Sequence, residues 1–357
     1  MPASWVEPLG LLQGRAASLA VAADLALPLA GGPAAFTMVR LIGPDAPGGA
    51  VPLADVPAAW QARVMALTQP VTAFAGLPRP MGHPLVMGIV NVTPDSFSDG
   101  GRHLDSRAAI AAGHAMLEAG ADLLDIGGES TRPGAEPVTA EEELARILPV
   151  LRELAKAATI SVDTRNAATM RAALEAGAEI VNDISALRHD PGAARVVAES
   201  EASVVLMHMP GDDPRTMQQD IHYEDVALDV ARFLAARVAW AEAQGIARKR
   251  IAVDPGIGFG KRGPENLELI ERLPILAGTF RPVVFGASRK RFIGEISGVE
   301  QAGQRVAGSV AAAMMAAQRG AAILRVHDVA KTVQALRVMA ACEAGEFGAM
   351  DAGAGEA

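Results

Sequence analysis

Polar residues suited to binding or catalysis follow a series of apolar runs along this chain of 357 residues. The clearest case is 85–101, where an apolar run gives way at Asn91 to a loop rich in Asp, Ser and Gly. In barrels of alternating strands and helices, side chains at the carboxyl ends of the strands form the active site. The recurring residues are Asn91, Asp125, Asp163, Asn182 with Asp183, His208, Asp254, Ser288 to Lys290, and Arg325 with His327. Singly, each is also typical of a helix cap or a turn, but together they predict one shared site.

One group of these residues is suited to a planar heterocycle. Asp163, Asn182 and Asp254 offer carboxylate and amide oxygens to amino and ring N–H donors, and Lys290 offers a donor to a ring nitrogen or carbonyl. A site that pairs every polar edge of its ligand rejects analogues that lack one. The same aspartates leave a metal–carboxylate cluster open as an alternative, although no histidines support it.

A second group is suited to an anion. The segment 288–291, Ser-Arg-Lys-Arg, follows the seventh predicted strand, and Arg325 and His327 end the eighth, where such barrels commonly bind phosphate. Arg132, in the second loop, is expected at the same corner, because arginine binds phosphate oxygens bidentately. Asn91 offers a neutral oxygen to a hydrated Mg²⁺. The alternative is a set of basic residues on a solvated rim, which the acidic composition disfavours.

The elements that position these residues alternate regularly. Strands are predicted to begin at Val86, Leu123, Ile160, Ile180, Val204, Ile251, Val283 and Ile323. Helices are predicted at 106–119, 139–157, 167–176, 191–200, 223–244, 264–273, 304–319 and 329–341. Eight strand–helix units of this total length predict an α/β fold of the (β/α)8 TIM-barrel type, which typically needs about 250 residues. A doubly wound open sheet is the alternative, disfavoured because no GxGxxG follows the first strand.

Composition divides the chain into three parts. Residues 1–80 hold 11 of the 23 prolines and no lysine, and are too apolar for classical disorder. We expect them to form a small N-terminal accessory region packed on the flank or bottom of the barrel. The barrel is predicted over residues 81–342, and residues 343–357, rich in Gly and Ala, are predicted to be a flexible tail.

Charge and cysteine content limit the partners. The net charge of −9 argues against nucleic acid or an anionic membrane as a partner. A single cysteine, Cys342, excludes an internal disulfide framework and favours a reducing cytoplasm. The apolar stretch 16–31 is interrupted by Asp24 and is too short to span a membrane. We therefore expect a cytoplasmic protein.

Several segments of the chain resemble the dihydropteroate synthases of bacterial folate synthesis. They are GIVNVTPDSFSDGG, DIGGESTRPGA, ISVDTR, IVNDIS, LMHMPG, VDPGIGFGK, GASRKRFIG and RVHDV, and they extend from Leu85 to about Ala341. Their number and order are highly specific. The resemblance does not reach residues 1–80.

The resemblance implies a role for individual residues. The pterin ring is expected against Asp163, Asn182, Met207, Asp254, Phe259, Gly286 and Lys290. The diphosphate is expected against Asn91, Arg132, Arg325 and His327, with Mg²⁺ at Asn91. p-Aminobenzoate is expected against Phe97, Thr131, Pro133 and Ser288. The residues expected to carry catalysis are Asn91, Thr131, Arg132, Lys290, Arg325 and His327. Arg291 stands where many relatives have serine, which leaves the partner of the p-aminobenzoate carboxylate open.

The implied reaction condenses a dihydropterin-methyl diphosphate with p-aminobenzoate in a homodimeric enzyme. Two other functions are compatible with the pterin-binding residues: a pterin-binding methyltransferase and a non-catalytic pterin-binding paralogue. The basic segment 288–291 with Arg325 and His327 argues against the methyltransferase, which has no diphosphate to bind. The paralogue would be distinguished by binding without product formation.

Overall fold

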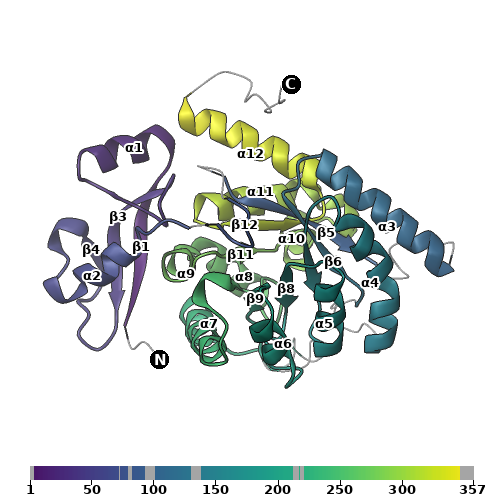
Figure 1. Ribbon diagram of the computed structural model, residues 1–357. Coiled ribbons are helices and arrows are strands. Elements are labelled where there is room, and N and C mark those ends of the chain that lie inside the picture. The colour runs from purple at the N-terminus through teal and green to yellow at the C-terminus, as the bar shows by residue number, and fades with distance from the viewer. Residues whose placement is uncertain are drawn as a thin grey trace, which may run out of the picture.

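The fold was analysed in a computed structural model (Figure 1). The structure describes residues 4–71, 73–78, 83–92, 101–129, 138–211, 217 and 221–345, with the backbone alone for residues 101–105. Within these limits the chain forms a barrel and a separate N-terminal sheet.

Eight parallel strands form the barrel. They are β5 (Leu85–Asn91), β6 (Leu123–Gly127), β7 (Thr159–Asp163), β8 (Ile180–Asp183), β9 (Ser203–Met207), β10 (Ile251–Asp254), β11 (Val284–Phe285) and β12 (Ile323–Val326). They are hydrogen-bonded in the order β10-β9-β8-β7-β6-β5-β12-β11. Between β10 and β11 a single parallel bridge joins Val253 to Val283, and the Val253 N–H donates to the Pro282 carbonyl at 3.2 Å. This bridge nearly closes the ring, and the predicted (β/α)8 barrel is confirmed.

Helices alternate with these strands and surround them (Figure 1). They are α3 (Gly101–Glu118), α4 (Ala140–Leu154), α5 (Ala167–Glu175), α6 (Ala193–Glu199), α7 (Val226–Ala243), α8 (Gly263–Glu271), α9 (Pro274–Thr279), α10 (Arg291–Ser297), α11 (Val306–Gln318) and α12 (Val329–Ala344). Short 3-10 turns occur at η3 (Arg248–Arg250) and η4 (Ala302–Gln304).

Helix α4 shows how the sequence sets a boundary. The Thr139 hydroxyl accepts from the Glu142 N–H at 3.2 Å, and the Glu142 carboxylate accepts from the Thr139 N–H at 3.3 Å. This capping box satisfies two N–H groups that would otherwise lack partners at the start of the helix. The sequence did not predict α9 and α10, because helices of six and seven residues show at most two turns of a helical period. The equally short α6 was predicted only within the longer stretch 191–200.

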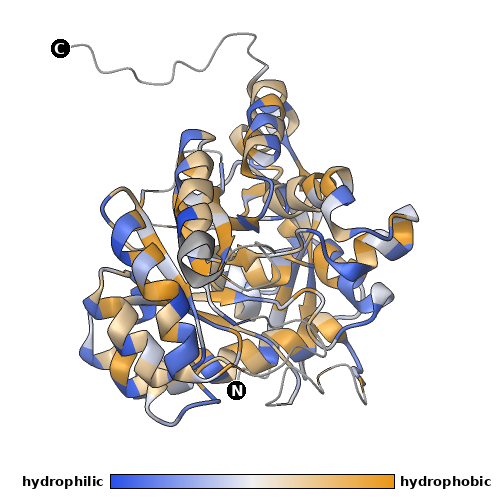
Figure 2. Cartoon of the chain, turned by 90° about the vertical axis from the view of Figure 1, so that its right-hand side faces the viewer, coloured by the Kyte–Doolittle hydropathy of each residue, from blue (hydrophilic) through white to orange (hydrophobic). Residues whose placement is uncertain are grey.

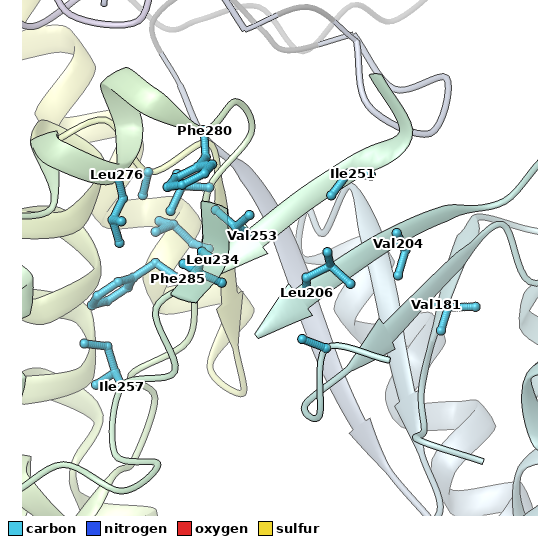
Figure 3. Packing of buried hydrophobic residues seen from close by; sticks show 14 of the residues in the cluster. Val181, Val204, Leu206, Leu234, Ile251, Val253, Ile257, Leu276, Phe280 and Phe285 are labelled. Carbon is cyan, nitrogen blue, oxygen red and sulfur yellow. The ribbon is translucent and has the colours of Figure 1, made fainter. Parts of the chain in front are cut away.

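The barrel has two apolar layers. The outer layer lies between strands and helices, and Figure 3 shows Val204, Leu206 and Val253 of the strands with Leu234 of α7 and Leu276 of α9. The central strands are coloured mainly as hydrophobic, and hydrophilic residues lie chiefly on the outer helices (Figure 2). The inner layer is filled by buried side chains from several strands: Met87, Leu123, Ile180, Val205, Ala252, Val284 and Ile323, with Phe74 from the connecting segment.

The N-terminal region forms its own antiparallel sheet. Its elements are β1 (Trp5–Leu12), α1 (Gly14–Ala22), β2 (Leu27–Pro28), β3 (Ala35–Ile42), β4 (Ala50–Pro52), η1 (Leu53–Asp55) and α2 (Ala58–Ala66). Strand β3 is central and pairs with each of the other three. Phe36, Val39, Trp60 and Val64 are buried in a core separate from that of the barrel.

This region lies against the flank of the barrel, beside α9 and α12 (Figure 1). The Glu7 carboxylate on β1 accepts from the Arg272 Nε at 2.7 Å, and the Arg281 guanidinium donates to the Ala66 carbonyl at 2.6 Å. Gln13 donates to the Gln318 carbonyl at 2.6 Å. The boundary predicted at residue 80 falls outside the described residues, so the predicted domain limits stay predictions.

Candidate active site

Five of the predicted polar residues lie at the carboxyl ends of neighbouring strands. Asn91, Asp163 and Asp183 are the last residues of β5, β7 and β8, and Asp254 is the last residue of β10. Asp163 and Asn182 are register partners on β7 and β8. Since all strands of a parallel barrel run in the same direction, these side chains meet at one rim.

Arg325 of β12 lies at the centre of this rim. Its Nε donates to Asp125 at 2.5 Å and a terminal nitrogen donates to Asp163 at 2.7 Å. Asp125, with no exposed surface, also accepts from the Ser161 hydroxyl at 2.5 Å and from the Asn182 amide at 3.1 Å. The guanidinium is therefore fixed between two carboxylates, and Asn182 is oriented with its carbonyl oxygen available to a donor.

Burial and neighbouring charges have opposing effects on the pKa values in this cluster. Burial raises the pKa of Asp163 from its ordinary 3.8 to about 7, although the Arg325 guanidinium works in the opposite direction and Asp125 adds to the rise. Burial alone would lower the pKa of Arg325, but Asp125 and Asp163 outweigh it and raise that pKa. Arg325 thus stays a cation, and Asp163 can exist with or without its proton near neutral pH.

Asp254 and Lys290 form the facing part of the site. One oxygen of Asp254 accepts from the Gly256 N–H at 2.6 Å, and the Lys290 ammonium donates to the Ile257 carbonyl and lies 4.2 Å from the centre of the Phe259 ring. Burial raises the pKa of Asp254. Burial lowers the pKa of Lys290 to about 7, an effect opposed by Asp254. The predicted pterin residues Asp254, Phe259 and Lys290 are thereby brought together.

Two more of the predicted pterin residues adjoin this group. Met207, at the end of β9, is buried in an apolar cluster with Ile184 and Met209, and Phe259 packs against it. A Cβ on Gly286 would lie 3.7 Å from Arg325 and 3.9 Å from Asp254, so Gly286 lies between the two charged groups. This part of the site therefore combines apolar side chains with several hydrogen-bonding groups.

The predicted anion corner is assembled around Ser288 and His327. The His327 Nδ1 lies 3.0 Å from the Ser288 hydroxyl, which also accepts from the His327 backbone N–H at 3.2 Å. Arg289 is bound bidentately by Asp328, at 3.0 and 2.7 Å. Arg291 is 88% exposed and pairs with Glu295 one turn later on α10. Within the basic segment, Ser288 and Lys290 face the site, whereas Arg289 and Arg291 are engaged elsewhere.

Comparison with known proteins shows which family has this arrangement. The chain matches the family described as pterin binding enzymes over residues 87–327. It is 50% identical to dihydropteroate synthase of Neisseria meningitidis serogroup B over 262 residues, covering 71% of this chain and 91% of the relative. The Escherichia coli K12 dihydropteroate synthase is 46% identical over 263 residues, which cover 73% of this chain and 92% of the relative. The chain belongs to the dihydropteroate synthase family.

Solved structures of the family superpose on the chain. The Xanthomonas albilineans dihydropteroate synthase with 4-aminobenzoic acid has a TM-score of 0.71 and 55% identity, and covers 76% of this chain and 97% of its own. The same enzyme in complex with 7,8-dihydropteroate gives a TM-score of 0.67 at 52% identity, and the match covers 74% of this chain and 95% of that one. Since the family match begins at residue 87, the N-terminal sheet lies outside it.

Several predicted dihydropteroate synthase residues cannot be placed. Phe97, Thr131, Arg132 and Pro133 lie outside the described residues, and their roles stay predictions. Asn91 is half-buried at the end of β5. Thus the described part of the site contains the predicted pterin residues, three of the four predicted diphosphate residues and, of the four predicted p-aminobenzoate residues, Ser288.

The sequence placed Asp125 among the strand-end residues but gave it no role in the site. Its pairing with Arg325 depends on β12 lying beside β5, which in turn pairs with β6, and no local signal in the sequence indicates it. Asp183, by contrast, has a structural role, because its carboxylate accepts from the backbone N–H groups of Ser185 and Leu187 at 2.7 and 3.0 Å. For Asp183 the turn interpretation is therefore the correct one.

Among the described residues, no helix has the length and apolar character needed to cross a bilayer.

Proposed function

We propose that this protein is a dihydropteroate synthase. It condenses (7,8-dihydropterin-6-yl)methyl diphosphate with p-aminobenzoate, giving 7,8-dihydropteroate and diphosphate. The observation that carries the proposal is the rim cluster in which Arg325 bridges Asp125 and Asp163 opposite Asp254 and Lys290. Family membership supports it independently.

The pterin ring is bound by complementary hydrogen bonds. The carboxylates of Asp163 and Asp254 accept from the amino group and ring N–H groups, and the carbonyl oxygen of Asn182 accepts another. Lys290 donates to a ring nitrogen or carbonyl oxygen. Because these groups are buried, an analogue that lacks one edge leaves a polar group unpaired, which costs about 1–3 kcal/mol.

The diphosphate is expected beside Arg325, His327 and Asn91, with Arg132 completing the corner. The described residues contain no group of three or more His, Cys, Asp or Glu side chains able to hold a metal ion. A Mg²⁺ ion here therefore fits only as an ion bound chiefly by diphosphate oxygens and water, with one oxygen from Asn91, which is a common arrangement for Mg²⁺. When bound, it neutralises charge on the departing diphosphate.

The reaction exchanges a C–O bond for a C–N bond. The bond between the pterin methylene and the diphosphate breaks, and the diphosphate leaves with the electron pair while the dihydropterin ring stabilises the cationic methylene. Arg325 and His327 stabilise the charge that develops on the leaving group. The p-aminobenzoate amine, near Ser288, then attacks the methylene and loses a proton. An aryl amine is nucleophilic without prior deprotonation, so the reaction needs no strong general base.

The assembly is expected to be a homodimer in the cytoplasm. Helices α8, α10 and α11 contact one another, and each exposes one large apolar side chain, Leu267, Ile296 and Met315 respectively, which a second copy could cover. The single cysteine, Cys342, is free and exposed, as is usual in a reducing compartment. Light scattering of an Ile296→Glu variant tests the dimer: loss of the dimer supports this face, and an unchanged mass contradicts it.

The activity itself is tested by mixing the purified protein with the pterin diphosphate, p-aminobenzoate and Mg²⁺ and measuring dihydropteroate. We expect turnover by the wild type, severe loss in Asp163→Asn, and wild-type rates in the matched control Glu175→Gln, an exposed residue of α5. Pterin binding without product would instead identify a non-catalytic paralogue.

A further inference from the structure

A second buried lysine lies next to the pterin pocket. Lys261 is only 3% exposed, and its ammonium lies 2.9 Å from the His208 Nδ1, 2.9 Å from the Gly256 carbonyl and 2.9 Å from the Phe259 carbonyl. The function proposed above assigns no role to Lys261 or His208. Burying an ammonium group is costly unless its N–H groups are all paired, and here three acceptors pair them.

The segment that Lys261 binds, residues 255–260, forms one wall of the pterin pocket. Its Gly256 N–H donates to Asp254, its Ile257 carbonyl accepts from Lys290, and its Phe259 ring lies beside the Lys290 ammonium. Ile257 is buried in the outer core, where Figure 3 shows it near Phe285. Lys290 thus binds this segment from the pocket side, and Lys261 binds two other carbonyls of the same segment.

Three glycines allow this segment to lie very close to its neighbours. Gly256, Gly258 and Gly260 all have positive φ, at 68°, 78° and 58°. A Cβ on Gly256 would lie 2.0 Å from the His208 carbonyl oxygen, and one on Gly258 would lie 2.8 Å from the Lys290 side chain. A segment in which every second residue is glycine has little intrinsic preference for one backbone conformation. Its shape must therefore be imposed by contacts from outside.

Those contacts come from a small buried group around Lys261. Asn266 accepts from the Gly258 N–H at 2.6 Å, and the Tyr223 hydroxyl donates to the Gly260 carbonyl at 2.9 Å. Burial, with Lys261 and Arg188 nearby, lowers the pKa of His208 well below its ordinary value, so the imidazole is neutral and offers Nδ1 as an acceptor. Burial and the Lys290 ammonium likewise lower the pKa of Lys261.

We propose that Lys261, oriented by His208, is a positioning residue that holds segment 255–260 in the shape required for Asp254, Phe259 and Lys290 to bind the pterin. The inference rests on the proposed function, because the ligand is the pterin of that reaction. In this proposal Lys261 acts through the segment and not through a contact with the substrate. Its effect should therefore be confined to the pterin and should not extend to p-aminobenzoate.

The experiment compares four variants with the wild type. Lys261→Met removes every bond donated by the ammonium at similar volume, His208→Leu removes the Nδ1 acceptor, and His208→Asn keeps an oxygen near the position of Nδ1. Lys249→Met, at an exposed lysine of η3, is the matched control. The measurements are the KM of each substrate, kcat, the melting temperature, and the Kd of 6-hydroxymethyl-7,8-dihydropterin by calorimetry.

We expect Lys261→Met to raise the KM of the pterin diphosphate and the Kd of the pterin by about tenfold, the effect of losing one or two buried hydrogen bonds. The KM of p-aminobenzoate should stay within about twofold of wild type. His208→Asn should bind pterin more tightly than His208→Leu, and this comparison carries the test if Lys261→Met does not fold.

A Lys261→Met protein with wild-type pterin affinity, even at a lower melting temperature, would show a purely structural role and overturn the proposal. Equal pterin affinity in the two His208 variants would do the same. Failure of the proposed function is distinguishable, because it appears in the wild type as absent turnover. The pterin Kd still tests the positioning role in that case.

Discussion

The ion pair between the N-terminal sheet and the barrel provides a quantitative test of docking. The Glu7 side chain is 4% exposed and is bound by Arg272 at 2.7 Å and by Arg40. Removing one partner of a buried ion pair costs about 3–5 kcal/mol. Arg272 keeps Asp225 and Glu268 as partners, at 2.7 and 2.6 Å. We therefore expect Glu7→Gln to lower the free energy of unfolding by about 2–3 kcal/mol, below the lower limit for a fully broken pair.

Tryptophan fluorescence during urea unfolding measures this change directly. Trp5 and Trp60 are buried in the N-terminal region, and Trp240, the third tryptophan, lies on α7. In a Trp240→Phe background the signal comes from Trp60, in the core of the N-terminal sheet, and from Trp5, which is buried in the barrel's core cluster, so it reports both unfolding of this region and its separation from the barrel. The shift in midpoint multiplied by the slope gives the free-energy change.

The matched control is Glu295→Gln, which makes the same chemical change in an exposed pair with Arg291. Its cost should be below about 1 kcal/mol. Both variants should keep wild-type kcat, since neither residue belongs to the rim cluster. If Glu7→Gln costs no more than Glu295→Gln, the pair does not contribute to docking and the reasoning is refuted.

Arg325→Ala should weaken binding of a diphosphate-free pterin as well as of diphosphate, because it removes the counter-charge of Asp125 and Asp163. Lys290→Ala should chiefly weaken binding of the pterin. Calorimetry with each ligand measures both effects, and each lost charge-assisted contact is worth about 1.5–3 kcal/mol. Unchanged pterin affinity in Arg325→Ala would mean that Arg325 serves the diphosphate alone. Sulfonamides should compete with p-aminobenzoate and bind more tightly when diphosphate and Mg²⁺ are present. If calorimetry gives the same sulfonamide affinity with and without diphosphate and Mg²⁺, this coupling is contradicted. Deleting residues 1–80 should lower the melting temperature or solubility with nearly unchanged Michaelis constants; an unaltered melting temperature, or constants raised about tenfold, would contradict the docking role. Burial raises the pKa of Asp163 from 3.8 to about 7, so the native state keeps a proton that the unfolded chain releases, and stability falls as pH rises across that interval. Asp163→Asn cannot titrate, and its melting temperature relative to wild type should therefore rise from about pH 4 to about pH 7; a relative fall would show that Arg325 dominates the titration.

The alternation of apolar runs with helical segments was sufficient to predict the barrel. Predicted strand starts such as Leu123, Ile180 and Ile323 coincide with those of the structure, because each buried parallel strand begins as a short apolar run. The same rule placed Asp163, Asn182 and Asp254 at one rim. These features depend on local composition and on strand direction alone, and both can be read from the chain.

The pairings within the site depended on the tertiary structure. Arg325 and Asp125 are 200 residues apart and meet because β12 pairs with β5, which pairs with β6. Glu7 and Arg272, 265 residues apart, meet only through docking of the N-terminal sheet. Lys261 follows a glycine-rich segment whose path is set by its neighbours. Residue types and strand ends are local properties of the sequence, whereas the partner of a buried charge is selected by ring closure and loop packing, which no local pattern encodes.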